Sequence, residues 1–297
     1  MLKDLNRRTF LKTGALTAYA TALSPYYGQV QTDAPTKEGM LHLGLVTYLI
    51  ARNWDIDTII KNCIRTKYEG VELRTTHAHK VEVNLTPAQR AEVKKKFEDS
   101  PVKLLGLGSI FEFQSDDPAV VRKNIDGTKE FVILAHDVGA KDVKVSPNGL
   151  PPTNKGIPEE KTLEQIGKSL KECGDYAKDY GIEIRLEVHG RETSRLPNIK
   201  KILDYADCDN VFVCWNCNST DLLDDGLESN FNLVKSKLSL VHMHDLTDEN
   251  YPFRKLLKLL VDSGYRGFCI AEIQGSSDPI RVLTYFRALF LAFQNII

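Results

Sequence analysis

Apolar and ionisable residues alternate along residues 182–190, a stretch that Gly181 and Gly190 punctuate. The even positions are aliphatic and the odd positions are ionisable: Ile182, Ile184, Leu186 and Val188 against Glu183, Arg185, Glu187 and His189. Successive side chains of a strand point to opposite faces, so the pattern predicts a strand with one apolar face and one charged face. A charged row on a central strand fits the interior of a closed parallel barrel, near its open end.

The same patterning recurs along the chain as eight strand-like segments, each followed by a segment with helical spacing. We expect strands at 41–48, 68–74, 102–109, 142–146, 182–190, 211–215, 238–244 and 266–273. We expect helices at 55–66, 86–98, 117–136, 162–180 (with Gly181 as the C′ residue that follows it), 196–206, within 227–237, at 251–261 and at 278–294. Eight such units predict an α/β fold, a single-domain (β/α)8 TIM barrel. An open doubly wound sheet is the alternative, but no G-x-G-x-x-G or Walker pattern supports a nucleotide-binding version.

Composition and charge narrow the range of partners. The chain has 297 residues, of which 42% are hydrophobic and 27% charged, and its net charge is −1. No overall basic field favours nucleic acid or an anionic membrane. A chain of this length builds its own core, so its six scattered cysteines need not form a disulfide framework. Cys214 and Cys217 form a lone C-x-x-C pair, for which a redox or zinc role is a minor alternative.

The first thirty residues are expected to be a leader. Residues 6–12, Asn-Arg-Arg-Thr-Phe-Leu-Lys, resemble the bacterial twin-arginine (Tat) signal, and a short apolar run follows at 15–23. The run is too short to span a membrane, and the first cysteine is Cys63, so no membrane anchor is expected. We therefore predict a signal peptide at 1–30, a linker at 31–39, the barrel at 40–297, and a periplasmic location. A basic amphipathic helix is the alternative for the leader.

Polar side chains gather where the expected strands end, which is where TIM barrels carry their chemistry. These residues are Glu72, Arg74, Glu187, His189, Asn216, Asn218, His242, His244 and Glu272. Glu187, His242 and Glu272 would supply the oxygen and nitrogen ligands that suit Mn²⁺, Mg²⁺, Co²⁺ or Zn²⁺. A salt network joining Arg74 and Arg185 to the glutamates is the alternative, and spacing alone leaves both open.

Four motifs in order also carry a family resemblance. They are Tyr-Glu-Gly-Val-Glu-Leu at 68–73, Glu-Val-His at 187–189, His-Met-His-Asp at 242–245, and Gly-Tyr-Arg-Gly at 264–267 followed by Glu272. The chain resembles the xylose isomerase-like TIM-barrel superfamily (AP endonuclease family 2), the broad sugar isomerase and epimerase group. The likeness runs from about Leu41 to the C-terminus.

The resemblance implies one divalent metal ion on Glu187, Asn216, His242 and Glu272. The family usually has Asp where this chain has Asn216, and His where it has Ser219. An amide oxygen carries no charge, so we expect weaker metal binding than in relatives, and loss of the metal is the alternative.

The resemblance also implies a metal-dependent sugar isomerase or epimerase that acts through an enediolate on a non-phosphorylated sugar. Glu187 and Glu272 would be its acid/base pair. Sugar contacts would come from His189, His244, Arg74, Glu72 and Asn218, with His77 and His79 as further candidates. A keto-sugar lyase or glycoside-cleaving enzyme, and a non-catalytic sugar-binding barrel, are the alternatives.

The trinuclear DNA-repair relatives need more metal ligands than these strand ends offer. The apolar last helix suggests a possible homo-oligomer.

Overall fold

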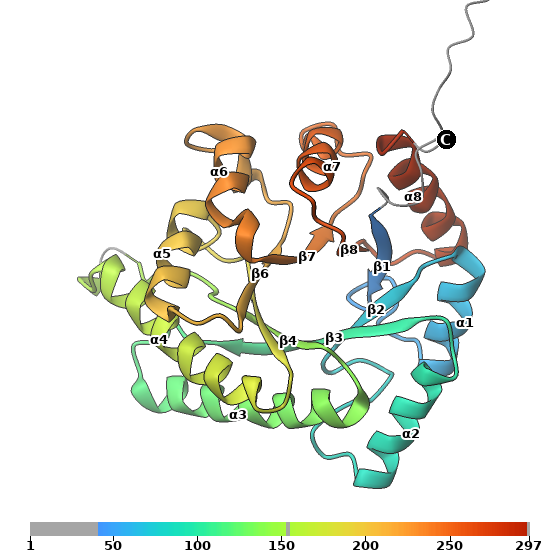
Figure 1. The fold of residues 1–297 in the computed structure, drawn as a ribbon, viewed down its shortest axis with the longest axis horizontal. Helices are drawn as coiled ribbons and strands as arrows, with labels where there is room; N and C mark the ends of the chain where they lie inside the picture. The colour runs from blue at the N-terminus through green and yellow to red at the C-terminus, as the bar shows by residue number, and fades with distance from the viewer. Residues whose placement is uncertain (1–40, 153–154, 296–297) are drawn as a thin grey trace, which may run out of the picture. The chain divides into compact units, whose positions relative to one another are not determined.

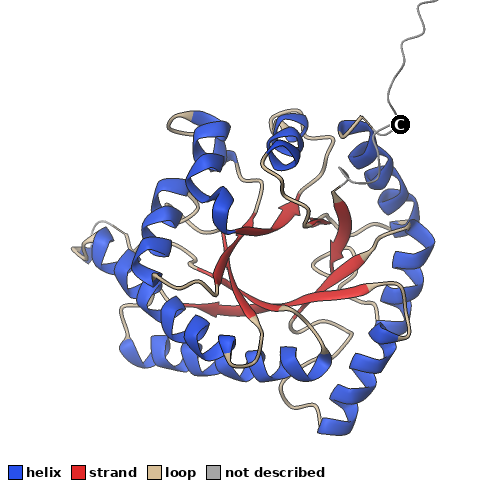
Figure 2. Cartoon of the chain, in the orientation of Figure 1, coloured by secondary structure: helices blue, strands red, loops and turns tan. Residues whose placement is uncertain are grey.

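The computed structural model describes residues 41–152 and 155–295. Eight strands, each parallel to its neighbours, close into a barrel in the order β1 to β8, with β8 paired back to β1. Helices follow the strands and form an outer ring (Figures 1 and 2). The predicted single-domain (β/α)8 TIM barrel is therefore confirmed. The leader and the linker lie outside the described residues and stay predictions.

The elements alternate from one end of the barrel domain to the other. The strands are β1 (His42–Val46), β2 (Gly70–Arg74), β3 (Lys103–Glu112), β4 (Asp142–Ser146), β5 (Glu183–Glu187), β6 (Val211–Trp215), β7 (Leu238–Met243) and β8 (Phe268–Ala271). The helices are α1 (Ile56–Thr66), α2 (Pro87–Glu98), α3 (Pro118–Val138), α4 (Glu159–Lys178), α5 (Leu196–Ala206), α6 (Gly226–Val234), α7 (Phe253–Asp262) and α8 (Pro279–Phe293).

Several element boundaries differ from the prediction by two or three residues. Strand β3 continues to Glu112, because a register shift lets its last residues pair with the end of β4. Helix α4 ends at Lys178 with Asp179 as its cap, so Gly181 lies in the following turn, where its φ is +66°. Strand β5 ends at Glu187 rather than at Gly190, whose φ of +91° bends the chain.

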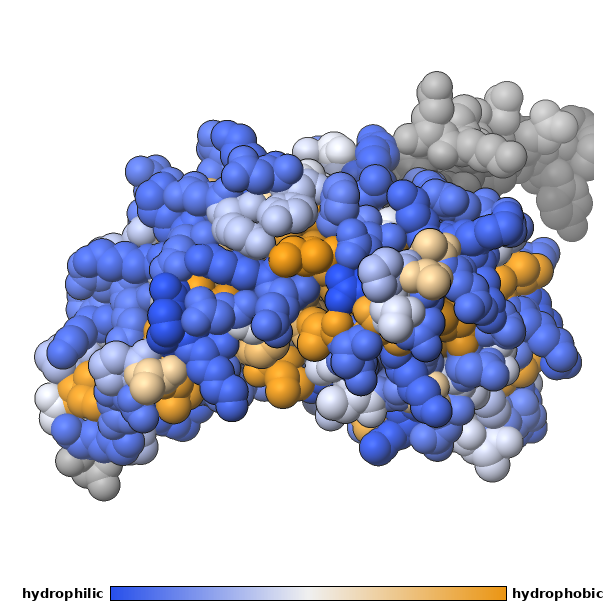
Figure 3. Space-filling view, turned by 90° about the horizontal axis from the view of Figure 1, so that it is seen from below, coloured by the Kyte–Doolittle hydropathy of each residue, from blue (hydrophilic) through white to orange (hydrophobic). Residues whose placement is uncertain are grey.

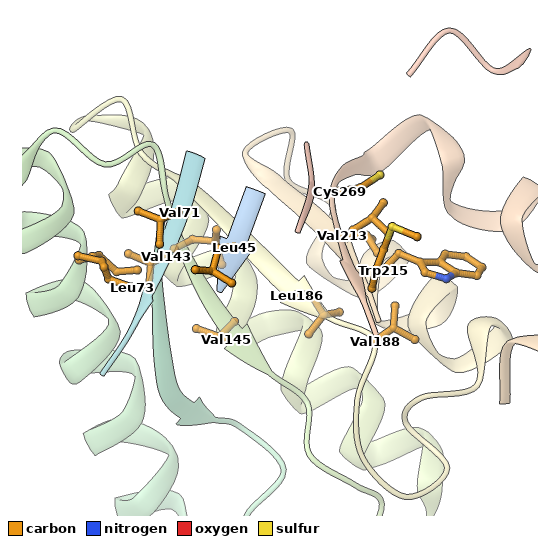
Figure 4. Packing of buried hydrophobic residues seen from close by; sticks show 14 of the residues in the cluster. Leu45, Val71, Leu73, Val143, Val145, Leu186, Val188, Val213, Trp215 and Cys269 are labelled. Carbon is orange, nitrogen blue, oxygen red and sulfur yellow. The ribbon is translucent and has the colours of Figure 1, made fainter. Parts of the chain in front are cut away.

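Two hydrophobic layers hold the barrel together. Outward-facing strand residues pack beneath the helices, and Leu45, Val71, Leu186 and Trp215 belong to this layer (Figure 4). A smaller cluster occupies the barrel interior: Val46, Leu105, Cys214, Leu240 and Ile270. Cys214 belongs to the inner cluster and Cys217 to the outer one, so the wall of the barrel separates the two thiols. This placement argues against the minor redox interpretation of the C-x-x-C pair.

The outer surface is mainly hydrophilic on the face drawn in Figure 3, where hydrophobic residues form small separate patches. Helix α8 buries Leu283, Phe286 and Phe290 against the barrel and leaves Tyr285 62% exposed. Its apolar surplus is thus largely used within the chain, and homo-oligomerisation stays a prediction. None of the described helices is both long and apolar enough to cross a bilayer.

Candidate metal centre at the C-terminal end of the barrel

Strand alternation places a polar row inside the barrel above the inner hydrophobic cluster. On β5 the aliphatic residues face the helices, and Arg185 and Glu187 face inward, as the pattern at 182–190 predicts. On β7 the same parity puts Leu240 into the inner cluster and His242 one level above it. The polar floor of the site therefore follows from the two-residue period of the strands.

A cavity of about 670 Å³ opens at this end of the barrel. All nine predicted site residues line it: Glu72, Arg74, Glu187, His189, Asn216, Asn218, His242, His244 and Glu272. Five strands far apart in sequence thus contribute to one site. A larger cavity of about 880 Å³ lies at the opposite end, among strand starts such as Lys103 and Lys141. That end of a TIM barrel ordinarily serves stability rather than chemistry.

Glu187, His242 and Glu272 converge at the floor of the cavity. One ligand atom from each lies within 4.8 Å of the other two. His242 Nδ1 is 3.5 Å from Glu187 Oε1 and 3.4 Å from Glu272 Oε2. The Glu272 backbone N–H donates to the Met243 carbonyl at 2.8 Å, which fixes the start of this side chain beside β7. Glu272 is the most accessible of the three, with 17% of its side chain exposed.

Glu72 lies on the other side of the His242 ring. Its Oε2 atom is 3.4 Å from His242 Nε2, and its side chain is fully buried. A carboxylate at Nε2 favours the proton on that nitrogen and leaves Nδ1 directed toward Glu187 and Glu272. Its burial beneath His242 favours an orienting role for Glu72 over the sugar contact predicted for it.

Two side chains that are not among the nine predicted site residues hold Glu187 in place. Lys144 Nζ and Ser146 Oγ, both on β4, each donate to Glu187 Oε2 at 2.7 Å. Burial disfavours the ionised form of Glu187, but the attraction of Lys144 and His242 outweighs the effect of burial. The pKa of Glu187 therefore lies well below its ordinary value. Burial likewise opposes the charge of Lys144, but Glu187 and Glu72 outweigh it and raise the pKa of Lys144. Both groups are therefore ionised. Polar and apolar residues alternate along 142–146, and this pattern could have predicted that Lys144 and Ser146 point into the barrel.

Asn216 and Asn218, which follow β6, form hydrogen bonds with neighbouring groups. Asn216 is buried, and its Oδ1 lies 3.2 Å from His244 Nε2, which in turn lies 3.5 Å from Glu272 Oε2. Asn218 donates its amide to the Val188 carbonyl at 2.6 Å, so it ties the end of β6 to the end of β5. Asn216 thus sits beside the cluster, while the amide of Asn218 is engaged by backbone.

The remaining predicted contacts lie higher in the cavity or outside it. His189 is exposed, and its Nδ1 lies 2.9 Å from Asn148 Oδ1. Arg74 donates to the Thr75 carbonyl at 3.4 Å. His77 and His79 are not among the residues that line the cavity. His79 bonds the Arg74 carbonyl and the Val81 N–H, which makes it a structural residue of the loop after β2.

The alternative salt network forms lower in the barrel, with different partners. Arg185 NH1 lies 2.8 Å from Asp142 Oδ2, and NH2 lies 3.1 Å from Glu183 Oε2. Burial raises the pKa of Asp142 to about 7 although Arg185 opposes the shift. Arg185 is therefore occupied below the site. Among the described residues, Lys144 is the lysine paired with Glu187, and the alternative network that joins Arg74 and Arg185 to Glu72, Glu187 and Glu272 is not observed.

The donor set fits a divalent cation. Among the described residues, His242 Nδ1 and Glu72 Oε1 are buried polar atoms without a hydrogen-bond partner of normal geometry. Glu72, Glu187 and Glu272 present three carboxylates to the Lys144 ammonium and the His242 ring. Burial opposes a charge on His242, but Cys214, Glu72 and Glu272 outweigh it and raise the pKa of the imidazole well above its ordinary value. Even with His242 protonated, one negative charge stays uncompensated. Buried uncompensated charge is costly, and a divalent ion relieves that cost.

A comparison with family models places residues 60–287 in the family described as "Xylose isomerase-like TIM barrel". The chain belongs to this family. The match covers most of the barrel, including every residue of the candidate metal centre, and confirms the resemblance of the four sequence motifs. A barrel of this kind is expected to have its functional site at the C-terminal ends of the strands.

Individual relatives are distant. Inosose isomerase from Bacillus velezensis is 23% identical over 199 residues, which cover 66% of this chain and 69% of that protein. A 3-keto-D-glucoside 4-epimerase from E. coli superimposes with a TM-score of 0.71 at 14% identity, over 85% of this chain and all of that one. A structure of the IOLI protein with a zinc atom gives a TM-score of 0.70 at 17% identity, over 85% and 99%. At these identities the structural likeness establishes the shared fold.

Proposed function

We propose that this protein is a metal-dependent isomerase or epimerase of a non-phosphorylated sugar or sugar derivative. The observation that carries the proposal is the convergence of Glu187, His242 and Glu272 within 4.8 Å at the floor of a polar cavity. The inosose isomerase and 3-keto-D-glucoside 4-epimerase relatives support the same reaction class. The carboxylate-rich floor disfavours phosphate groups by charge repulsion.

Glu187, His242 and Glu272 would hold the ion, with the Asn216 amide oxygen beside them as a neutral fourth ligand. A bound divalent cation would polarise the sugar carbonyl and stabilise the negative charge of an enediolate. Glu72 orients His242, and Lys144 keeps Glu187 ionised. Glu272, the more exposed carboxylate, is well placed to take a proton from the carbon beside the carbonyl. Glu187 would be its acid/base partner on the other side of the substrate, where it starts as a base and acts as an acid only after it has taken up a proton. His189, His244 and Arg74 would contact sugar hydroxyls.

Exchange of a sugar C–H for solvent deuterium tests this proposal. Neutral ketoses, aldoses and 3-keto-glycosides are incubated with the Mn²⁺-supplemented protein in D₂O and followed by NMR. We expect deuterium at the carbon next to a carbonyl, and a loss of at least about a hundredfold in rate in Glu272→Gln. Exposed Glu69, which pairs with His42, supplies the matched control Glu69→Gln. Exchange that proceeds equally in Glu272→Gln would contradict the assignment.

The same experiment separates the alternatives. A keto-sugar lyase or glycoside-cleaving enzyme would release a leaving group along with deuterium exchange. A non-catalytic sugar-binding barrel would bind sugar without exchange. We further propose that the twin-arginine leader exports the protein to the periplasm, where non-phosphorylated sugars would be its substrates.

A further inference from the structure

Lys144 is the residue of this site whose placement calls for an explanation of its own. Its side chain is only 7% exposed, and its ammonium nitrogen lies 2.7 Å from Glu187 Oε2. A lysine is rarely buried to this extent without a specific partner. Here the partner is one of the three side chains that would hold the metal ion.

We propose that Lys144 competes with the divalent cation for Glu187 and thereby sets a low metal affinity for the site. This inference rests on the proposed metal-dependent function. The Lys144 ammonium and the Ser146 hydroxyl occupy Glu187 Oε2, so only Oε1 faces His242. Glu187 thus has one free oxygen to offer, and it shares its charge with a built-in cation.

Electrostatics fixes the direction of the effect. An ammonium and a divalent ion that share one carboxylate repel each other in a poorly screened interior. Removal of the ammonium frees Oε2 as a second ligand atom and removes the repulsion, so the metal should bind more tightly. A lysine that merely supported the fold would have the opposite effect, since its loss would loosen Glu187 and weaken binding.

The test is a calorimetric titration of the chelator-treated protein with Mn²⁺ alone. Lys144→Met should lower the dissociation constant by about tenfold or more, and Lys144→Arg, which keeps the charge, should stay within about threefold of the parent. Ser146→Ala removes a hydrogen bond to the same oxygen without a change in charge, so it should also stay within about threefold. If Lys144→Met fails to fold, Lys144→Gln carries the same expectation.

Lys129 provides the matched control. It pairs with Glu172 at the same 2.7 Å distance on the outer helices, so Lys129→Met breaks a lysine–glutamate pair away from the site and should leave Mn²⁺ affinity unchanged. Unchanged or weaker binding in Lys144→Met and Lys144→Gln would overturn the inference. If the parent fails to bind Mn²⁺ and Lys144→Met binds it, the inference stands and the metal-dependent function falls. If neither binds Mn²⁺, both fall.

Discussion

The metal centre depends on how individual side chains restrain one another. His242 is 1% exposed and has carboxylates at both ring nitrogens: Glu72 at Nε2, and Glu187 with Glu272 at Nδ1. Imidazole ligands ordinarily need such an outer partner to hold their tautomer and ring orientation. Glu72 supplies this partner from β2.

The variant Glu72→Gln tests this orienting role. Loss of the charge at Nε2 should weaken Mn²⁺ binding by about tenfold to a hundredfold, because His242 loses the partner that directs Nδ1 toward the ion. Calorimetric titration gives the dissociation constant. The control is Glu69→Gln, which removes an exposed carboxylate 2.7 Å from His42. Equal affinities in the two variants would rule out the role of Glu72.

Much of this centre could be predicted from the sequence because strand periodicity is local. Glu187 and His242 lie on strands whose neighbouring residues are apolar, so their inward direction follows from parity alone. Lys144 and Ser146 lie on an equally regular strand, but which carboxylate they would meet depends on the register between β4 and β5. That register is set by barrel closure, which no local pattern encodes.

At the scale of elements, close approach of neighbouring strands restricts which residues fit between them. A side chain at Gly106 of β3 would place its Cβ only 2.1 Å from Asp142 Oδ1 of β4. Asp142 is fully buried and pairs with Arg185 on β5. The glycine thus makes room for an ion pair that links two further strands.

Gly106→Ala should therefore lower the free energy of unfolding by about 2–3 kcal/mol, because Asp142 must move away from Arg185 or the strands must separate. Urea-induced unfolding followed by circular dichroism measures the change. Gly275→Ala is the control, since its Cβ would lie 3.7 Å from the nearest atom and should cost little. Equal stabilities would show that β3 and β4 tolerate the added methyl group.

The segment after β6 carries a buried acid that makes stability depend on pH. Tyr251 donates to Asp221 Oδ2 at 2.7 Å and accepts from Trp215 Nε1 at 2.9 Å. Burial raises the pKa of Asp221 from 3.8 to about 7. Between these values the native state keeps a proton that the unfolded state has released, so the stability contribution of Asp221 falls as pH rises from about 4 to 7.

Asp221→Asn should remove this dependence. The variant should be more stable than the parent by up to about 4 kcal/mol at pH 8, with the difference vanishing near pH 4. Urea unfolding at pH 4, 6 and 8 provides the comparison, with the exposed Asp209→Asn as control. A stability difference that stays constant with pH would contradict the account of this acid.

Element boundaries were predicted less well than element order, for physical reasons. The end of β3 at Glu112 depends on pairing with Ser146 after a register shift, a long-range contact. Helix α4 ends two residues before its predicted end, and its preceding loop contains the undescribed residues 153–154. Where a helix carries its own signal, as at the Thr86–Gln89 capping box of α2, the predicted start is within one residue.

At the scale of the whole molecule, family membership establishes the barrel, and the chemistry rests on the residues of the site. The relatives are 14–23% identical over the compared regions, so their activities are guides to the reaction class. Asn216 stands where the family resemblance implies an Asp, and its amide carries no negative charge. The ammonium of Lys144 partly offsets the negative charge of Glu187.

Export of the molecule is testable through its leader. Combined Arg7→Lys and Arg8→Lys substitutions should keep the protein in the cytoplasm of a host that has the twin-arginine pathway, because that signal is read through its paired arginines. Cell fractionation and immunoblotting measure the distribution, with Lys3→Arg as the control. Periplasmic protein at the parental level in the double variant would contradict the proposed signal.

The central claim is that Glu187, His242 and Glu272 hold one divalent ion. Its most direct test is the number of Mn²⁺ ions bound per chain at saturation, measured by calorimetry on the chelator-treated protein and on Glu272→Gln. We predict one ion per chain in the parent and an affinity at least about a hundredfold weaker in Glu272→Gln. No saturable binding in the parent, or unchanged binding in the variant, would contradict the account.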